Sequence, residues 1–239
     1  LARALIQYHI DRDIPCSVFD TDRSNPDVMR IYGKSTGCKI GVFSEGERYE
    51  DTANASFNAA INQKVICDLP AHVFIPLREW IEKNELLELA KESGVTFYLW
   101  HVSDCGSDSL KLFTRSLKHF GSPIPHIFIR NYGMTDDWEA FDDDEALQHL
   151  VQQYQVSVID FPKFIGNRDR NAIDNLNLTF GDAREYKGFG PITRQRVKSF
   201  LKKAYAAFDQ VPFLHPSRVM KDEIVPFVRP TPRREEEQV

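Results

Sequence analysis

Short apolar runs rich in Val, Ile and Phe alternate with longer segments of helical periodicity along most of the chain. Strands that are nearly continuous in apolar residues are buried on both faces, which is typical of a parallel sheet covered by helices. The alternation therefore predicts a three-layer α/β fold with a mostly parallel sheet. The expected strands span 15–20, 64–69, 95–104, 125–132 and 156–161, and the expected helices span roughly 53–62, 74–92, 108–120, 138–153 and 168–184.

The two ends of the chain depart from this alternation. The opening segment, LARALIQYHIDR, has helical rhythm with no capping residue ahead of Leu1, so we expect the chain to begin inside an element whose preceding part is missing. We predict one α/β domain over 1–186, an amphipathic C-terminal helix within 187–212, and a Pro-rich, disordered tail over 213–239.

Composition narrows the class of protein. The chain has 239 residues, of which 42% are hydrophobic, enough for a sizeable core. Its four cysteines are far apart and form no C-x-x-C pair, so we expect neither disulfides nor a zinc site. No apolar run is long enough for a membrane span and no signal peptide is evident, which predicts a cytoplasmic protein without membrane contact. The net charge of -5 argues against broad binding of nucleic acid but permits a local basic patch.

Polar residues at the ends of the predicted strands carry the candidate chemistry. The carboxyl ends of parallel strands meet at one edge of a sheet, where ligands bind. A single acid there is most often a helix cap or turn former, but several together are unfavourable unless a cation or a reaction uses them. Mg²⁺ with a phosphate ligand fits this pattern, because it needs only one or two carboxylates. The residues concerned are Asp20, Asp22, Asp68, Asp104 and Asn131.

Four segments resemble one protein family. SVFDTDRSNPD and VICDLPA resemble the switch I and Walker B segments of ParA/MinD-type deviant Walker ATPases, which belong to the P-loop superfamily. FYLWHVSDCGSDSL and IFIRNYG look most like plasmid-borne MobD-like proteins, or proteins with the CobQ/CobB/MinD/ParA domain. The resemblance covers roughly residues 1–183.

This resemblance implies a P-loop NTPase-like fold with ATP and Mg²⁺ as cofactors. Asp22 matches the catalytic acid that positions the attacking water. Asp68 matches the Walker B acid near Mg²⁺ and Asp20 is its strand-end neighbour, both acting on the metal through water. Asn131 matches a position that often contacts the adenine edge.

The family's glycine-rich phosphate loop, G-x-x-x-x-G-K-[ST], does not occur in the sequence. We expect this loop and the strand before it to lie ahead of Leu1. The segment YGKSTGCK (32–39) is interpreted as a surface loop rather than a phosphate cradle. We expect the polar stretch from Asp22 to Gly46 to be a mobile loop at the face of a nucleotide-dependent homodimer.

The resemblance implies an ATP-hydrolysing switch protein in plasmid or chromosome partitioning or mobilisation. The alternative is a non-hydrolysing adaptor of the same fold that binds protein partners in a DNA-processing complex. The last helix has two interpretations: its apolar side packs against the sheet, or its basic side also binds nucleic acid directly.

Other residues favour structural interpretations. His101 and His126 fit core histidines better than metal ligands. Cys105 and Ser107 lie at a strand-to-helix turn, where Ser107 or Asp108 as a helix cap is a simpler interpretation than a nucleophile.

Overall fold

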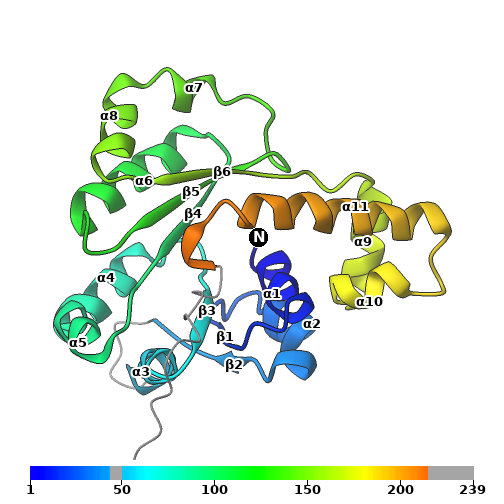
Figure 1. The fold of residues 1–239 in the computed structure, drawn as a ribbon, viewed down its shortest axis with the longest axis horizontal. Coiled ribbons are helices and arrows are strands. Elements are labelled where there is room, and N and C mark those ends of the chain that lie inside the picture. Colours follow the sequence, from blue (N-terminus) through cyan, green and yellow to red (C-terminus); the bar gives the residue numbers. More distant parts are fainter. Residues whose placement is uncertain (44–49, 215–239) are drawn as a thin grey trace, which may run out of the picture.

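The computed structural model describes residues 1–43 and 50–214, which form an α/β fold of two parallel sheets flanked by helices (Figure 1). The strands are β1 (Cys16–Asp20), β2 (Lys39–Ile40), β3 (Lys64–Asp68), β4 (Leu99–Ser103), β5 (His126–Asn131) and β6 (Ser157–Phe161). The helices are α1 (Ala2–Asp11), α2 (Asp27–Thr36), α3 (Glu50–Ala60), α4 (Phe74–Lys83), α5 (Leu86–Ser93), α6 (Ser107–Phe120), α7 (Glu139–Asp142), α8 (Glu145–Gln153), α9 (Asn167–Asn175), α10 (Phe180–Glu185) and α11 (Pro191–Phe208), followed by the 3-10 turn η2 (Pro212–Leu214).

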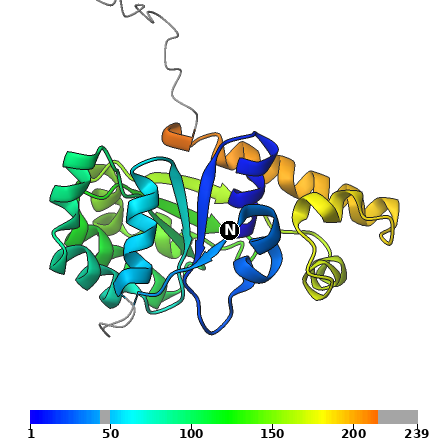
Figure 2. The ribbon, with the colours of Figure 1, turned by 90° about the horizontal axis from the view of Figure 1, so that it is seen from below.

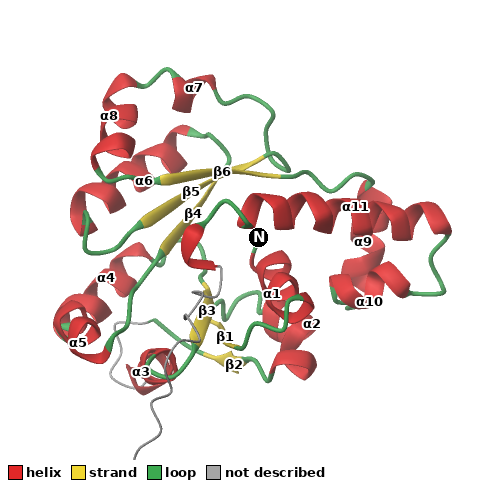
Figure 3. Cartoon of the chain, viewed as in Figure 1, coloured by secondary structure: helices red, strands yellow, loops and turns green. Residues whose placement is uncertain are grey.

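The strands divide into two three-stranded sheets, ordered β2-β1-β3 and β4-β5-β6, in which every pair is parallel. Figure 3 shows β3 and β4 as the inner strands of this arrangement. Within the described part of the chain, β3 pairs only with β1 and β4 only with β5, so each presents one edge without a strand partner.

One hydrophobic core joins the two sheets. Its buried members include Val18 and Ile66 from the first sheet and Ile127 and Ile159 from the second. The same cluster takes in the apolar faces of α1 and α11, which lie across the strands from α4 and α5 (Figure 2). Packing of the last helix against the sheet is therefore confirmed, and residues before and after position 186 belong to the same core.

The five predicted strands are confirmed, although β4 begins at Leu99 rather than at 95. The predicted helix 74–92 is instead two helices, because Glu85 adopts a left-handed backbone with φ of 50° between α4 and α5. The predicted helix 138–153 is divided at Asp144, whose side chain caps α8 by accepting from the Leu147 amide at 2.9 Å. The predicted helix 168–184 is broken near Asn177, which has φ of 52°.

The expected loop between Asp22 and Gly46 is wrong for most of its described part. Residues Asp27–Thr36 form α2, which buries Val28, Ile31 and Tyr32, and Lys39–Ile40 form β2. The GKST segment is thus the last turn of a helix that ends at Gly37 with φ of 62°, not a surface loop. Residues 44–46 lie outside the described part.

Two residues of the predicted tail, Phe213 and Leu214, belong to the described structure. Phe213 belongs to η2 and stacks on Tyr98 with ring centroids 3.6 Å apart, and residues 215–239 lie outside the described part. Within residues 1–43 and 50–214, no helix combines the length and apolar character that a membrane span requires.

Candidate functional site at the ends of β1 and β3

Two acids meet where β1 and β3 end. Because the strands are parallel and paired from Cys16 with Lys64 onward, Asp20 lies directly beside Asp68 in the ladder. Beyond this pair, Thr21 ties the two strand ends together: its amide and its hydroxyl both donate to the Asp68 carbonyl, at 3.0 and 2.7 Å. The predicted convergence of Asp20 and Asp68 is thus a consequence of parallel pairing in register.

The Asp20 carboxylate is fully buried and holds backbone around it. One oxygen accepts from the Asp22 amide at 3.1 Å and the other from the Met29 amide at 2.8 Å. Met29 lies in the first turn of α2, which has no capping side chain at Pro26. Asp20 therefore takes the place of a capping residue at the start of α2, although it lies outside that helix, and it fixes the loop between β1 and α2.

Asp22 forms the turn that follows. One of its carboxylate oxygens accepts from the Ser24 and Asn25 amides, at 2.9 and 3.1 Å. This is an Asx-type turn, the structural role most common for an acid at this place. Asp22 is half-buried, and its charge is close enough to raise the pKa of Asp68.

Asp68 differs from its neighbour. Burial raises its pKa to about 6, and the negative charge of Asp20 adds to the effect. No hydrogen bond or ion pair engages its carboxylate within residues 1–43 and 50–214. The site therefore has one carboxylate fully used by backbone amides and one whose oxygens are free to bind something else.

The amino end of α1 faces the same acid. The start of α1 lies close to Asp68, because α1 packs against β3. Leu1 occupies the N-cap position of α1 and no side chain caps the helix there. The first turn of α1 thus brings a positive helix end next to Asp68, an arrangement that local sequence patterns alone do not predict.

Asn131 and Asp104 follow strands of the other sheet and form turns of their own. The Asn131 side-chain oxygen accepts from the Gly133 amide at 3.1 Å, and an Asp104 oxygen accepts from the Gly106 amide at 2.9 Å. Among the contacts of the described residues, none joins either side chain to Asp20, Asp22 or Asp68. The structure brings together three of the five predicted strand-end residues.

The carboxylates of this site suit a hydrated Mg²⁺ better than a metal bound only by protein. No three His, Cys, Asp or Glu side chains within residues 1–43 and 50–214 are arranged to hold a metal ion. Mg²⁺ needs one or two carboxylates and keeps its waters, and the free oxygens of Asp68 meet that requirement. Each Asp20 oxygen already accepts a hydrogen bond from a backbone amide, so Asp20 fits a position outside the water shell of the ion better than direct coordination.

The remaining candidates are structural. His126 is buried: its Nδ1 donates to the Ile124 carbonyl at 2.7 Å and its Nε2 accepts from the Ser116 hydroxyl at 2.8 Å. Burial lowers the pKa of His101 and of His126 to about 4, so both are neutral core histidines as predicted. Burial raises the pKa of the Cys105 thiol, which disfavours a thiolate. The predicted cap of α6 is wrong, because Gly106 is the N-cap and no side chain bonds there.

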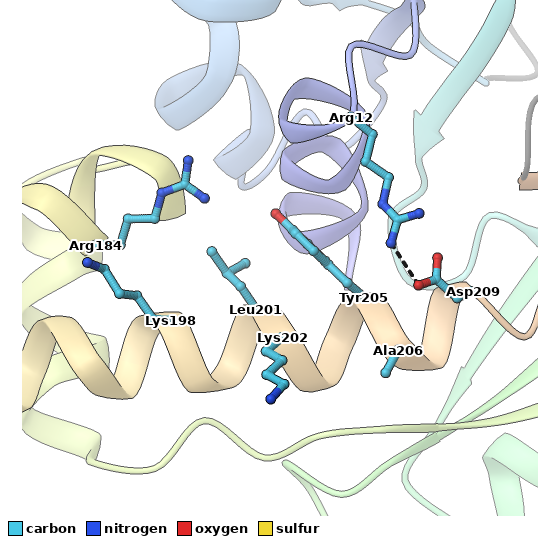
Figure 4. Close-up of a pocket in the computed structure, with 8 residues that line it drawn as sticks. All are labelled: Arg12, Arg184, Lys198, Leu201, Lys202, Tyr205, Ala206 and Asp209. Carbon is cyan, nitrogen blue, oxygen red and sulfur yellow. Dashed lines mark hydrogen bonds and ion pairs between the residues drawn. The ribbon is translucent and has the colours of Figure 1, made fainter.

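A separate cavity of about 450 Å³ lies between α1, α10 and α11 (Figure 4). Its cations are largely matched by carboxylates: Arg12 pairs with Asp209 at 2.7 Å, Arg184 with Asp11, and Lys198 with Glu185 at 3.2 Å. None of the predicted site residues lines this cavity. It is a compensated ion-pair cluster.

No protein-family model matches the chain, and no curated protein is significantly similar to it in sequence.

Proposed function

We propose that the chain is the core of a ParA/MinD-like ATPase that binds ATP with Mg²⁺ beside Asp68. The observation that carries this proposal is the in-register pair of Asp20 and Asp68 next to the amino end of α1. Carboxylates that hold a hydrated cation and a helix amino end that attracts phosphate are the two elements of a nucleotide–magnesium site.

The proposal includes one further strand between the two sheets. The edges of β3 and β4 are unpaired in the described residues, and a strand parallel to both would give the order β2-β1-β3-new-β4-β5-β6. Such a strand would end near Asp68 and could enter α1 through a glycine-rich loop, with the phosphates at the first turn of the helix. The P-loop NTPase-like fold remains part of the proposal and depends on this strand.

Each acid has a role in the proposal. Bound Mg²⁺ would neutralise charge on the transferred phosphate. Asp68 would hold the waters of that ion, and Asp20 would keep the loop and α2 in place behind them. Asp22 would orient the attacking water with the oxygen that does not cap its own turn, and Asn131 would reach the adenine edge.

The proposed biological role is a nucleotide switch in plasmid or chromosome partitioning or mobilisation, with a homodimer that closes over ATP. Its face would include the Asp22 turn and the start of α2. A non-hydrolysing adaptor for a DNA-processing complex is the second candidate, favoured by the observation that Asp20 and Asp22 already have structural roles.

Replacement of Asp22 separates these candidates. In the full-length protein, including any sequence encoded ahead of Leu1, Asp22→Ala should slow single-turnover ATP hydrolysis by roughly 10²- to 10⁴-fold and leave ATP affinity within a few-fold. The same variant should gain dimer mass in light scattering when ATP and Mg²⁺ are added. Wild-type binding without turnover would favour the adaptor, and hydrolysis unaffected by the substitution would remove Asp22 from catalysis.

A further inference from the structure

A groove of about 820 Å³ runs along α6 beside α7 and the start of α8. Three cations line it, Lys111, Arg115 and Lys118, and all three are exposed. They lie on one face of α6 because they are spaced i, i+4 and i+7, and at 1.5 Å per residue they extend over about 10 Å. This α6 groove is remote in sequence from the acids of β1 and β3.

The cations of the α6 groove lack the matching carboxylates seen in the α11 cavity. Within residues 1–43 and 50–214, no carboxylate lies within ion-pair distance of Lys111, Arg115 or Lys118. The Arg115 guanidinium is held over the Phe74 ring, 4.7 Å from its centroid, and keeps its hydrogen-bond donors available. In a chain with net charge -5, such a row of uncompensated cations favours an anionic partner.

The other bank of the groove adds a small residue and one acid. Ala140 of α7 and Asp144 line it, and the Asp144 carboxylate is engaged as the cap of α8. Among the residues that line the groove, His119 is the one aromatic ring, and its Nε2 lies 2.8 Å from a Glu82 carboxylate oxygen, so the groove offers no row of rings for stacked bases. Leu110 adds apolar surface between the banks, which suits a peptide.

We propose that the α6 groove docks an acidic helix of a partner protein whose carboxylates are spaced i, i+4 and i+7. Each carboxylate would face one of Lys111, Arg115 and Lys118, in the manner of charged pairs that set partner choice between neighbouring helices. Small side chains of the partner helix would pack on Leu110 and Ala140. This surface works independently of nucleotide binding at Asp68.

Fluorescence anisotropy with a labelled synthetic peptide tests the surface. The probe is an alanine-rich helix with Glu at i, i+4 and i+7, and its control has Gln at those positions. The full-length protein, including any sequence encoded ahead of Leu1, should bind the Glu peptide, more weakly as salt rises, and should not bind the Gln peptide. The double variant Lys111→Glu/Lys118→Glu should lose at least about tenfold in affinity, and Lys111→Gln/Lys118→Gln should lose less.

The matched control is Lys198→Glu/Lys202→Glu, which makes the same change in net charge on α11 and should leave affinity within about twofold. Circular dichroism of each variant checks that the helices are intact. Three results would overturn the proposal: no binding of the Glu peptide, equal loss in the α6 and α11 variants, or tighter binding of an oligo(dT) strand that Lys111→Glu/Lys118→Glu abolishes.

Discussion

At the scale of single residues, Asp20 and Asp68 show how one ladder position gives two different carboxylates. Both follow parallel strands and face each other in register. The Asp20 carboxylate accepts hydrogen bonds from two backbone amides. The Asp68 carboxylate is half-buried and has no hydrogen-bond or ion-pair partner among the described residues. Adjacent acids in such unequal environments are typical of sites where one positions and the other binds.

The raised pKa of Asp68 predicts how stability depends on pH. Its folded-state pKa is about 6, against 3.8 for a fully solvated Asp side chain, so the folded protein holds this proton more strongly than the unfolded chain. That contribution favours folding below about pH 4 and is lost as pH rises through about 6. In urea unfolding, Asp68→Asn should equal wild type at pH 4 and exceed it by roughly 1–3 kcal/mol at pH 7.5.

Asp104→Asn is the control for this measurement, because it removes an exposed carboxylate from a turn of the other sheet. Its stability relative to wild type should change little between the two pH values. A pH-independent difference between Asp68→Asn and wild type would show that Asp68 ionises without a cost, and hence that its carboxylate is not poised to bind a cation.

Part of the site could be predicted from sequence because it depends on strand ends. Strand periodicity places Asp20 and Asp68 at carboxyl ends, and parallel pairing then brings them together. The occupation of the Asp20 oxygens could not be predicted, since its partner Met29 belongs to a helix that was interpreted as loop. The amino end of α1 beside Asp68 depends on tertiary packing and has no signal in the local sequence; only the resemblance, which puts the phosphate loop ahead of Leu1 and Asp68 near Mg²⁺, implies it.

At the scale of elements, α2 connects the candidate site with α1 and α10. Its buried Tyr32 hydroxyl donates to the Gln7 side-chain oxygen at 3.1 Å and accepts from the Phe180 amide at 3.0 Å. Gln7 Oε1 also accepts from the Gly181 amide at 2.8 Å. The hydroxyl thus joins α2, α1 and the start of α10. A shift of α2 would therefore strain or break the hydrogen bond to the Phe180 amide of α10.

Removing this hydroxyl should loosen the start of α10. Tyr32→Phe leaves the Phe180 amide without its acceptor, at a cost of about 1–2 kcal/mol in the free energy of unfolding. In hydrogen exchange followed by NMR, the Phe180 amide should exchange faster than in wild type while amides of β5 do not change. Tyr186→Phe, which removes a hydroxyl from a 38% exposed residue, is the matched control.

If both variants lose equal stability, or if protection of the Phe180 amide is unchanged, the buried bond does not couple α2 to α10.

The signal for α2 is present in the sequence, because Val28, Ile31 and Tyr32 are spaced for one face of a helix. Gly33 and Gly37 oppose this helical signal, because glycine favours loops, and with them the stretch is predicted as a loop. The broken helices have a different origin: Glu85 and Asn177 take left-handed backbone, which periodicity does not detect. Strong periodicity therefore predicted where helices occur, but not where tertiary packing divides them.

At the scale of the whole molecule, the two parallel sheets share one core and leave the edges of β3 and β4 free in the described residues. A free inner edge is unusual because backbone donors and acceptors there have no partner. In our proposal a single parallel strand resolves this and delivers a phosphate loop to the first turn of α1. In that arrangement the acids Asp20 and Asp68, the amino end of α1 and the edges of β3 and β4 all belong to one nucleotide site.

The most direct test is the ATP affinity of the full-length protein, measured by calorimetry with and without Mg²⁺, for wild type, Asp68→Asn and Asp104→Asn. Our account expects Mg²⁺-dependent binding that Asp68→Asn weakens about 10- to 100-fold, as for residues that hold a metal through its outer shell. Asp104→Asn should stay within about twofold of wild type. Equal affinity in all three proteins, or no ATP binding by wild type, would contradict a nucleotide site at Asp68.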